Sequence, residues 1–306
     1  MKAPHPRLSL HAALICGVLT VVDAQAAAYT FIVAGLGGEP EYEQRFRQQA
    51  ASVAAAAEKV AGDSSHVVTL TGAQARRASV RRELEALASR MRAEDVVTVV
   101  LIGHGSFDGE EYRFNVPDVD LTATELGRLF DELPAKDQLI VNATSASGVT
   151  AERWQRPQRV IITATKSGGE RTATRFAQHW AAAVTTDAAD LDKDEIVTAN
   201  EAFEYATRQV AAAFKADVAL ATEHSRIEGD NASRFTVARL GSSAAPTNAA
   251  ASALLSQRGQ IERELDAVKE RKASLSEDAY YDELEAVLVR LARLQKQIDA
   301  QLGATE

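Results

Sequence analysis

Two short polar segments stand where buried strands end, and their side chains are of the kinds that carry out hydrolysis. The run VVTVVLIG is followed by His104 and Gly105, and the run LIVNA is followed by Thr144 and Ser145. A histidine can act as general acid or base, a glycine-turn N–H can stabilise an oxyanion, and a hydroxyl can act as nucleophile. Because ligands of open α/β sheets bind at the carboxyl ends of the strands, we expect these segments to share one edge of a sheet.

The elements that would position these segments alternate along residues 29–240 of the 306-residue chain. The strand-like runs are continuously apolar or β-branched, a pattern typical of a parallel sheet covered on both faces. We expect strands at 29–34, 66–70, 95–103, 137–143, 159–165 and 234–240, and helices at 41–60, 73–91, 122–133, 172–184 and 199–214. This order predicts an α/β domain of three layers with a mainly parallel sheet of about six strands.

The composition changes after residue 240. Residues 241–252 form a linker of small residues, and residues 253–306 read as two charged helices. Apolar residues in the second helix recur at alternating three- and four-residue steps, with Gln295 at the one polar position: Tyr281, Leu284, Leu288, Leu291, Ile298 and Leu302. This spacing predicts an α-helical hairpin or coiled coil, which folds back on itself or on the main domain, or alternatively recruits a partner or a second copy by self-association.

The first 28 residues have the pattern of a secretory signal peptide. Lys2 and Arg7 precede an uncharged, mostly apolar run at 12–22, which is shorter than the roughly 20 residues needed to span a bilayer. The only cysteine, Cys16, would leave with this segment, so the mature chain would have neither disulfide nor thiolate. We expect an exported protein, periplasmic or extracellular, with no integral membrane segment after signal removal.

Other ligand classes are not favoured. The formal net charge of -9 and the mixed charges at 76–92 argue against a nucleic-acid partner. The glycines at 35–38 follow a strand, but Pro40 stands where a dinucleotide loop has its third glycine. Neither Ser106 nor Ser145 has the flanking glycines of an α/β-hydrolase nucleophile. We therefore expect no cofactor.

One acidic stretch matches most of a calcium-binding EF-hand loop. Carboxylate or hydroxyl residues fill loop positions one, three, five, nine and twelve: Asp190, Asp192, Asp194, Thr198 and Glu201. Position six, normally glycine, is Glu195, which would need a positive φ that non-glycine residues seldom adopt. A helix with an acidic first turn, capped by Thr198 or Asn200, explains the same residues without metal. We expect no metal here and keep calcium as the weaker alternative.

Five stretches, in order, resemble segments of the legumain and caspase group of cysteine peptidases, especially bacterial legumain-like proteins. They are GHGSFDG, NATSASG, ITATKSGGERTATRFAQHWAAAV, DAADLDKDEIVTANEAFEYA and ATEHSRIEGDN. The resemblance covers roughly residues 29–240 and leaves out the linker and the hairpin. It implies a caspase-like fold in which His104 matches the catalytic histidine and the Gly105 N–H an oxyanion-hole donor. Ser145 falls on the position of the nucleophilic cysteine.

The serine changes the chemistry that the resemblance implies. A free thiol has a pKa of about 8.5 and readily gives a thiolate, whereas a serine needs a base within hydrogen-bond reach. Asp108 is the nearest candidate in sequence to orient His104 as that base. We expect a peptidase homologue without catalysis, a pseudoenzyme that binds peptide or protein at the cleft. The alternatives are a serine-type peptidase using Ser145 and His104, and a scaffold that acts through the C-terminal hairpin.

The signal-peptide pattern predicts the N-terminus of the mature protein. Small residues at 24, 26 and 28 offer two Ala-x-Ala cleavage sites, so secreted protein should begin between Ala27 and Tyr29. N-terminal sequencing of the exported material measures this directly. A mature protein that retains residues 1–26 would contradict the prediction.

Overall fold

The computed structural model describes most of the chain. The described residues are 26–230, 232–241, 254, 257–258, 261, 264–265, 267–269 and 271–303. The expected signal peptide, up to residue 25, and all of the expected linker except Gly241 lie outside the described residues.

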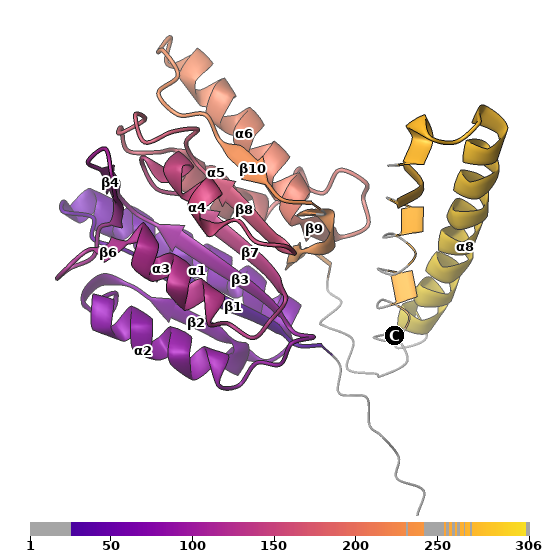
Figure 1. The fold of residues 1–306 in the computed structure, drawn as a ribbon, viewed down its shortest axis with the longest axis horizontal. Coiled ribbons are helices and arrows are strands. Elements are labelled where there is room, and N and C mark those ends of the chain that lie inside the picture. Colours follow the sequence, from indigo (N-terminus) through magenta and orange to yellow (C-terminus); the bar gives the residue numbers. More distant parts are fainter. Residues whose placement is uncertain are drawn as a thin grey trace, which may run out of the picture.

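A six-stranded sheet with the order β10-β8-β7-β3-β1-β2 forms the centre of the molecule (Figure 1). The parallel strands are β1 (Ala28–Ala34), β2 (Val67–Leu70), β3 (Val96–Ile102), β7 (Asp137–Asn142) and β8 (Arg159–Thr163). The last strand, β10 (Arg226–Glu228), runs antiparallel to β8. The expected α/β architecture with a mainly parallel sheet is therefore confirmed.

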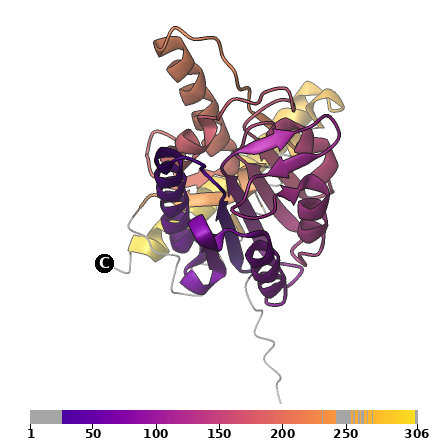
Figure 2. The same ribbon diagram turned by 90° about the vertical axis from the view of Figure 1, so that its left-hand side faces the viewer.

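Helices cover both faces of this sheet (Figure 2). One face packs against α1 (Pro40–Ala61), α5 (Phe176–Ala183) and α6 (Ala199–Ala216), and the other against α2 (Arg77–Ala88), α3 (Ala123–Asp131) and α4 (Thr150–Trp154). Successive strand residues point to opposite faces, so the aligned Ile32, Val100 and Val141 belong to the first core. Their neighbours Phe31 and Val99 belong to the second.

Side-chain caps set the start of two helices. The Thr122 hydroxyl accepts a hydrogen bond from the Glu125 N–H at the start of α3. Thr198 and Glu201 form a reciprocal capping box at the start of α6. Both caps satisfy N–H groups that the first helical turn leaves without a backbone partner.

The last predicted strand forms, but it does not join the central sheet, and in this respect the prediction is wrong. β11 (Thr236–Arg239) pairs with β9 (Ile196–Thr198) in a separate two-stranded sheet, and β10 occupies the sheet edge instead. A second small sheet, which the sequence did not reveal, contains β4 (Gly105–Phe107), β5 (Tyr112–Phe114) and β6 (Leu121–Thr122). Strands of two or three residues are too short to show alternation.

Short 3-10 helices lie at Ser64–His66, Gly72–Gln74, Ser147–Val149, Ala232–Arg234 and Arg271–Ala273.

The C-terminal region contains α8 (Glu277–Gly303), which packs against the described helical residues between 254 and 269. The contact seam agrees with the predicted one at Leu284, Leu291 and Ile298 but differs from it by one residue at two other positions. Tyr280, Val287 and Leu294 are buried in it, whereas Tyr281 is 53% exposed and Leu288 is 45% exposed. The sequence carries two overlapping apolar stripes on this helix, and periodicity does not distinguish which of them faces the partner helix.

Across the described residues, no helix combines the length and the apolar character that crossing a membrane requires.

Candidate functional site

The two polar segments meet at the carboxyl edge of the sheet. β3 and β7 are adjacent and parallel, with Leu101 aligned to Asn142. Just beyond these residues, the Gly105 N–H donates a hydrogen bond to the Ser145 hydroxyl, with an N···Oγ distance of 3.4 Å. A side chain at position 105 would not fit, because a Cβ there would lie 2.5 Å from the Ser145 carbonyl oxygen. The contact thus depends on the glycine.

Ser145 is enclosed rather than presented. Its residue is 2% exposed, and the segment at 166–170 packs against the residues that follow it in the turn. The N–H of Ala146, which adopts a φ of 55°, donates to the Glu170 carbonyl at 2.8 Å. Gly148 permits the close approach, since a Cβ at that position would lie 2.2 Å from the Ser167 nitrogen. At this exposure, a substrate could reach the Ser145 hydroxyl only if the surrounding chain opened.

A buried hydrogen-bond network lies beneath the turn. The Tyr112 hydroxyl and Thr144 Oγ1 are 2.7 Å apart, and Thr144 also donates to Asn142 Oδ1 at 2.8 Å. The Asn142 amide donates to Thr150 Oγ1, and that hydroxyl donates to the Ser147 carbonyl. Burial raises the pKa of Tyr112 to about 12, so its hydroxyl stays neutral and available as a donor.

The network continues to the end of β8. Ser147 Oγ lies 3.2 Å from Thr165 Oγ1, which accepts from the Gly148 N–H at 2.9 Å. Thr163 donates to the Thr165 carbonyl at 2.8 Å. The sequence pointed to Thr144 and Ser145, but the roles of Ser147, Thr163 and Thr165 were not predicted. The signal for them was the repeated small hydroxyl residues after two successive strands.

The His104 ring lies against α1. It meets the rings of Tyr42 and Phe46 nearly edge-on, with centroid distances of 4.7 and 5.1 Å. Partial burial lowers the pKa of His104, and a hydrogen bond with the Gly37 backbone acts in the opposite direction. The imidazole is therefore neutral at pH 7.

No hydrogen bond joins His104 to Ser145 in the part of the chain that the structure describes. Asp108 does not orient the ring either. Its carboxylate accepts the N–H groups of Glu110 and Glu111 and pairs with Arg113 at 2.5 Å, in the turn between β4 and β5. These interactions, the Glu111 hydrogen bond foremost, hold the pKa of Asp108 below its usual value. The arrangement lacks the contact between nucleophile and base that serine catalysis needs.

The glycine loop at 35–38 uses its N–H groups internally. The Gly35 N–H donates to the Ile102 carbonyl, the Leu36 N–H to the Asn115 carbonyl, and the Gly37 N–H to Glu43 Oε1 at 2.7 Å. A phosphate-binding loop directs such groups at its ligand. These three are committed to the protein.

A carboxylate and histidine cluster, missed from the sequence, lies beside the covering segment. Glu170 Oε1 is 2.5 Å from His224 Nδ1, and Glu170 Oε2 accepts from the Lys166 N–H. The neighbouring Glu223 is 3% exposed and accepts the Arg175 N–H at 2.7 Å. Burial foremost, with Glu170 adding to it, raises the pKa of Glu223 to about 7. These residues stand far apart in sequence and meet only because β10 pairs with β8.

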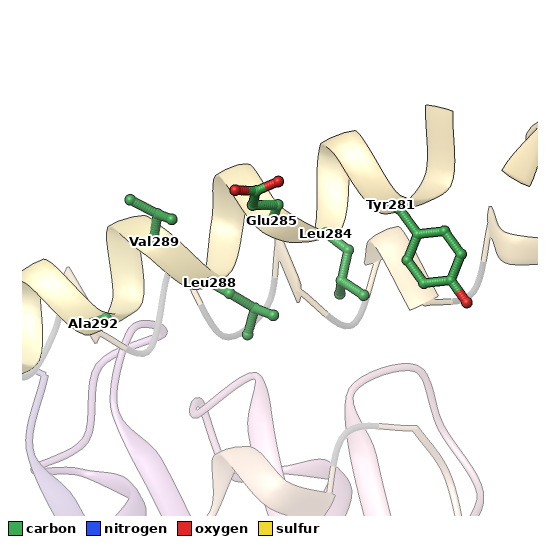
Figure 3. Close-up of a pocket in the computed structure, with 6 residues that line it drawn as sticks. All are labelled: Tyr281, Leu284, Glu285, Leu288, Val289 and Ala292. Atoms are coloured by element: carbon green, nitrogen blue, oxygen red, sulfur yellow. The ribbon is translucent and has the colours of Figure 1, made fainter. Parts of the chain in front are cut away.

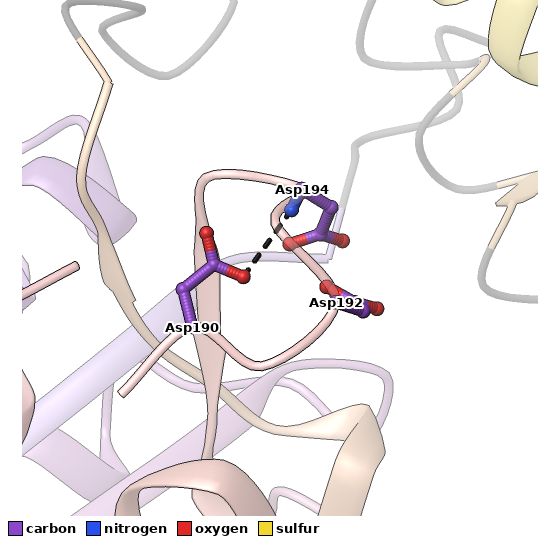
Figure 4. Close-up of side chains that lie close together, drawn as sticks. All are labelled: Asp190, Asp192 and Asp194. Atoms are coloured by element: carbon purple, nitrogen blue, oxygen red, sulfur yellow. Dashed lines mark hydrogen bonds between the residues drawn. The ribbon is translucent and has the colours of Figure 1, made fainter. Parts of the chain in front are cut away.

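The acidic loop before α6 brings three carboxylates together (Figure 4). Asp190, Asp192 and Asp194 can each place an oxygen within 4.8 Å of the others. Asp190 accepts the N–H groups of Asp194 and Glu195. Glu195 adopts a φ of 64°, the conformation that the sequence analysis held against calcium. That backbone argument against an EF-hand loop is therefore wrong.

The same carboxylates already have partners within the chain. Asp194 pairs with Arg258 of the C-terminal region, and Glu201 accepts the N–H groups of Leu191 and Thr198. Burial foremost, followed by the charges of Asp194 and Glu201, raises the pKa of Asp192 to about 6. The loop thus leads into the capped first turn of α6, as we expected for these residues in the absence of metal. It also brings several negative charges close together.

Comparisons with known proteins leave the family open. No family model matches the chain, and no curated protein matches it. Among solved structures, protein GSU0716 from Geobacter sulfurreducens is similar at a TM-score of 0.43 and 11% sequence identity. That alignment covers 70% of this chain and 100% of the other. A likeness of this size carries no functional argument.

Glu223 should make stability depend on pH near neutrality. Its pKa is raised in the folded chain from an ordinary value of 4.5 to about 7, so the stability it contributes is present below pH 4.5 and lost as pH rises through 7. Glu223→Gln should therefore be more stable than wild type at pH 8, by on the order of 2 kcal/mol, with little difference at pH 4.5. Urea unfolding at both pH values measures this. Glu58→Gln, at an exposed helix position, is the control and should show no such trend.

Asp192 should behave in the same direction in the acidic loop. Its folded pKa of about 6 lies above the ordinary 3.8, so its stabilising contribution is lost as pH rises through 6. Asp192→Asn should raise the melting temperature at pH 8 and leave it nearly unchanged at pH 4. Asp187→Asn removes an exposed charge outside the cluster and serves as the control. Equal shifts for both variants would show that net charge, rather than the cluster, is responsible.

Proposed function

We propose that the chain is an exported, non-catalytic homologue of the caspase and legumain group that binds a peptide or protein at the edge formed by β3 and β7. The observation that carries the proposal is the hydrogen bond from the Gly105 N–H to the Ser145 hydroxyl. The resemblance assigns that N–H to the oxyanion and that position to the nucleophile. Here the two groups engage each other instead of a substrate.

The surroundings of Ser145 support the absence of catalysis. A serine nucleophile must pass its proton to a base in direct contact, and the neutral His104 packs on aromatic rings of α1. The turn that holds Ser145 is also closed by the segment at 166–170, through the bond between Ala146 and Glu170. Activating this serine would require both a new contact and an opening.

The neighbouring strand supports a binding role. β4 begins at Gly105 and forms one edge of its three-stranded sheet, and Ser106 at its centre is exposed. Extended peptides commonly bind by adding a strand to such an edge, where main-chain hydrogen bonds supply affinity. A peptide bound along β4 would lie beside Gly105 without needing access to the Ser145 hydroxyl.

Three variants test the absence of catalysis. Wild type and Ser145→Ala should both leave a broad peptide library uncleaved, as measured by mass spectrometry. Ser145→Cys should also leave the library uncleaved and should react with iodoacetamide far more slowly than an open thiol, because position 145 is 2% exposed and burial in the protein suppresses the thiolate. Ser106→Cys, at the exposed position of β4, gives the reference rate for an open thiol. Cleavage by wild type but not by Ser145→Ala would overturn the proposal.

Hydrogen exchange tests the binding role separately. Peptides retained from the same library should slow amide exchange in β4, at residues 105–107, in wild type and in Ser145→Ala alike. Protection that falls only on α8 would instead favour a scaffold that acts through the hairpin. Failure of the library to yield any bound peptide at about 100 µM would count against the proposed function.

A further inference from the structure

α8 presents a second apolar stripe to solvent. The first stripe, with Tyr280, Val287 and Leu294, is buried against the preceding helical residues. Among the described residues, the second lines a shallow groove on α8 (Figure 3): Tyr281, Leu284, Glu285, Leu288, Val289 and Ala292. In Figure 3 the side chains of Tyr281, Leu284 and Leu288 project to one side of the helix.

This exposure is more than scattered surface hydrophobicity. Tyr281, Leu288 and Val289 are 53%, 45% and 40% exposed within about two turns of one helix. Isolated apolar side chains are normal on a protein surface, whereas a contiguous stripe marks an interaction site. Residues 281, 284, 288 and 292 also follow the three- and four-residue spacing of a helix–helix interface.

The charges beside the stripe indicate what covers it. Acidic residues, Asp278, Asp282 and Glu285, stand in the first half of α8, and basic residues, Arg293 and Lys296, in the second half. Among the described residues none of these five forms an ion pair, whereas Glu283 and Arg290 pair across the hairpin with Arg271 and Glu264.

A helix that is acidic in its first turns and basic between residues 290 and 296 complements an antiparallel copy of itself over that length. Pairing about Leu288 would place Asp282 of one copy near Arg293 of the other, and the same contact would recur across the two-fold axis. Parallel pairing would place acid opposite acid and base opposite base, which is unfavourable.

We propose that the outer stripe of α8 is a homodimer interface. The α8 helices of two copies pack antiparallel about an axis near Leu288, so that two hairpins form a four-helix bundle. Such an interface is self-complementary and buries the exposed stripe on both chains. The proposal rests on α8 only and is independent of the peptide-binding edge at β3 and β7.

Oligomeric state tests the interface. The mature chain should sediment as a dimer at about 10 µM in analytical ultracentrifugation, and Leu288→Glu should weaken dimerisation by at least about a hundredfold, since it buries two carboxylates at the axis. Ala286→Glu adds the same charge two residues away, on the exposed far face of α8, and should remain dimeric. Circular dichroism confirms that both variants stay folded. A monomeric wild type, or equal behaviour of the two variants, would overturn the proposal.

Cross-linking tests the orientation, because the mature chain is expected to contain no native cysteine. Leu288→Cys should form an intermolecular disulfide on mild oxidation. In an antiparallel pair, positions 281 of the two copies are separated by about 21 Å, from a rise of about 1.5 Å per residue, so Tyr281→Cys should not cross-link. Cross-linking at 281 but not at 288 would contradict the antiparallel arrangement.

Discussion

Buried hydroxyl and amide groups at the ends of β7 and β8 must all find partners, and the candidate site depends on this requirement. Asn142, Thr144 and Thr165 are completely buried, and an unpaired polar group there would cost about 1–3 kcal/mol. Their hydrogen bonds run from Tyr112 to Thr165 and bind the turn after β7 to the turn after β8. Because these hydrogen bonds join the two turns, neither turn can change its backbone conformation without breaking bonds to the other.

The position of Ser145 follows from that mutual support. The turn places its hydroxyl within reach of the Gly105 N–H, and the segment at 166–170 packs against the residues that follow it. A hydroxyl in an enclosed site is stable when it accepts a hydrogen bond, and this one does. The same segment contains Glu170, which pairs with His224. This pair connects the segment at 166–170 to the chain beside the edge strand β10. The site is therefore a packed and hydrogen-bonded unit, and this packing is the basis of the proposal that ligands bind at its rim.

Among the described residues, the C-terminal hairpin contacts the α/β domain through an ion pair, and the buried apolar residues of the two parts fall in separate clusters. Arg258 pairs with Asp194 in the acidic loop, while the apolar residues of α8 form a cluster of their own. Asp194 lies among carboxylates that repel one another. The positive charge of Arg258 reduces this repulsion and so stabilises the loop. This ion pair contacts the hairpin without covering the outer apolar stripe of α8, which stays exposed to solvent.

The sequence by itself determined the five parallel strands, because continuous apolar runs suit strands covered on both faces, and it determined that the segments of His104 and Ser145 meet at one edge. Short elements such as β10 escaped it, since three residues show no periodicity. Tertiary structure alone decided that Glu223 lies beside Glu170 and that Ser145 faces Gly105 rather than His104, because such contacts depend on how distant segments pack. It also decided which of two overlapping stripes on α8 is buried, a choice that rests on the partner helix and not on α8's own residues.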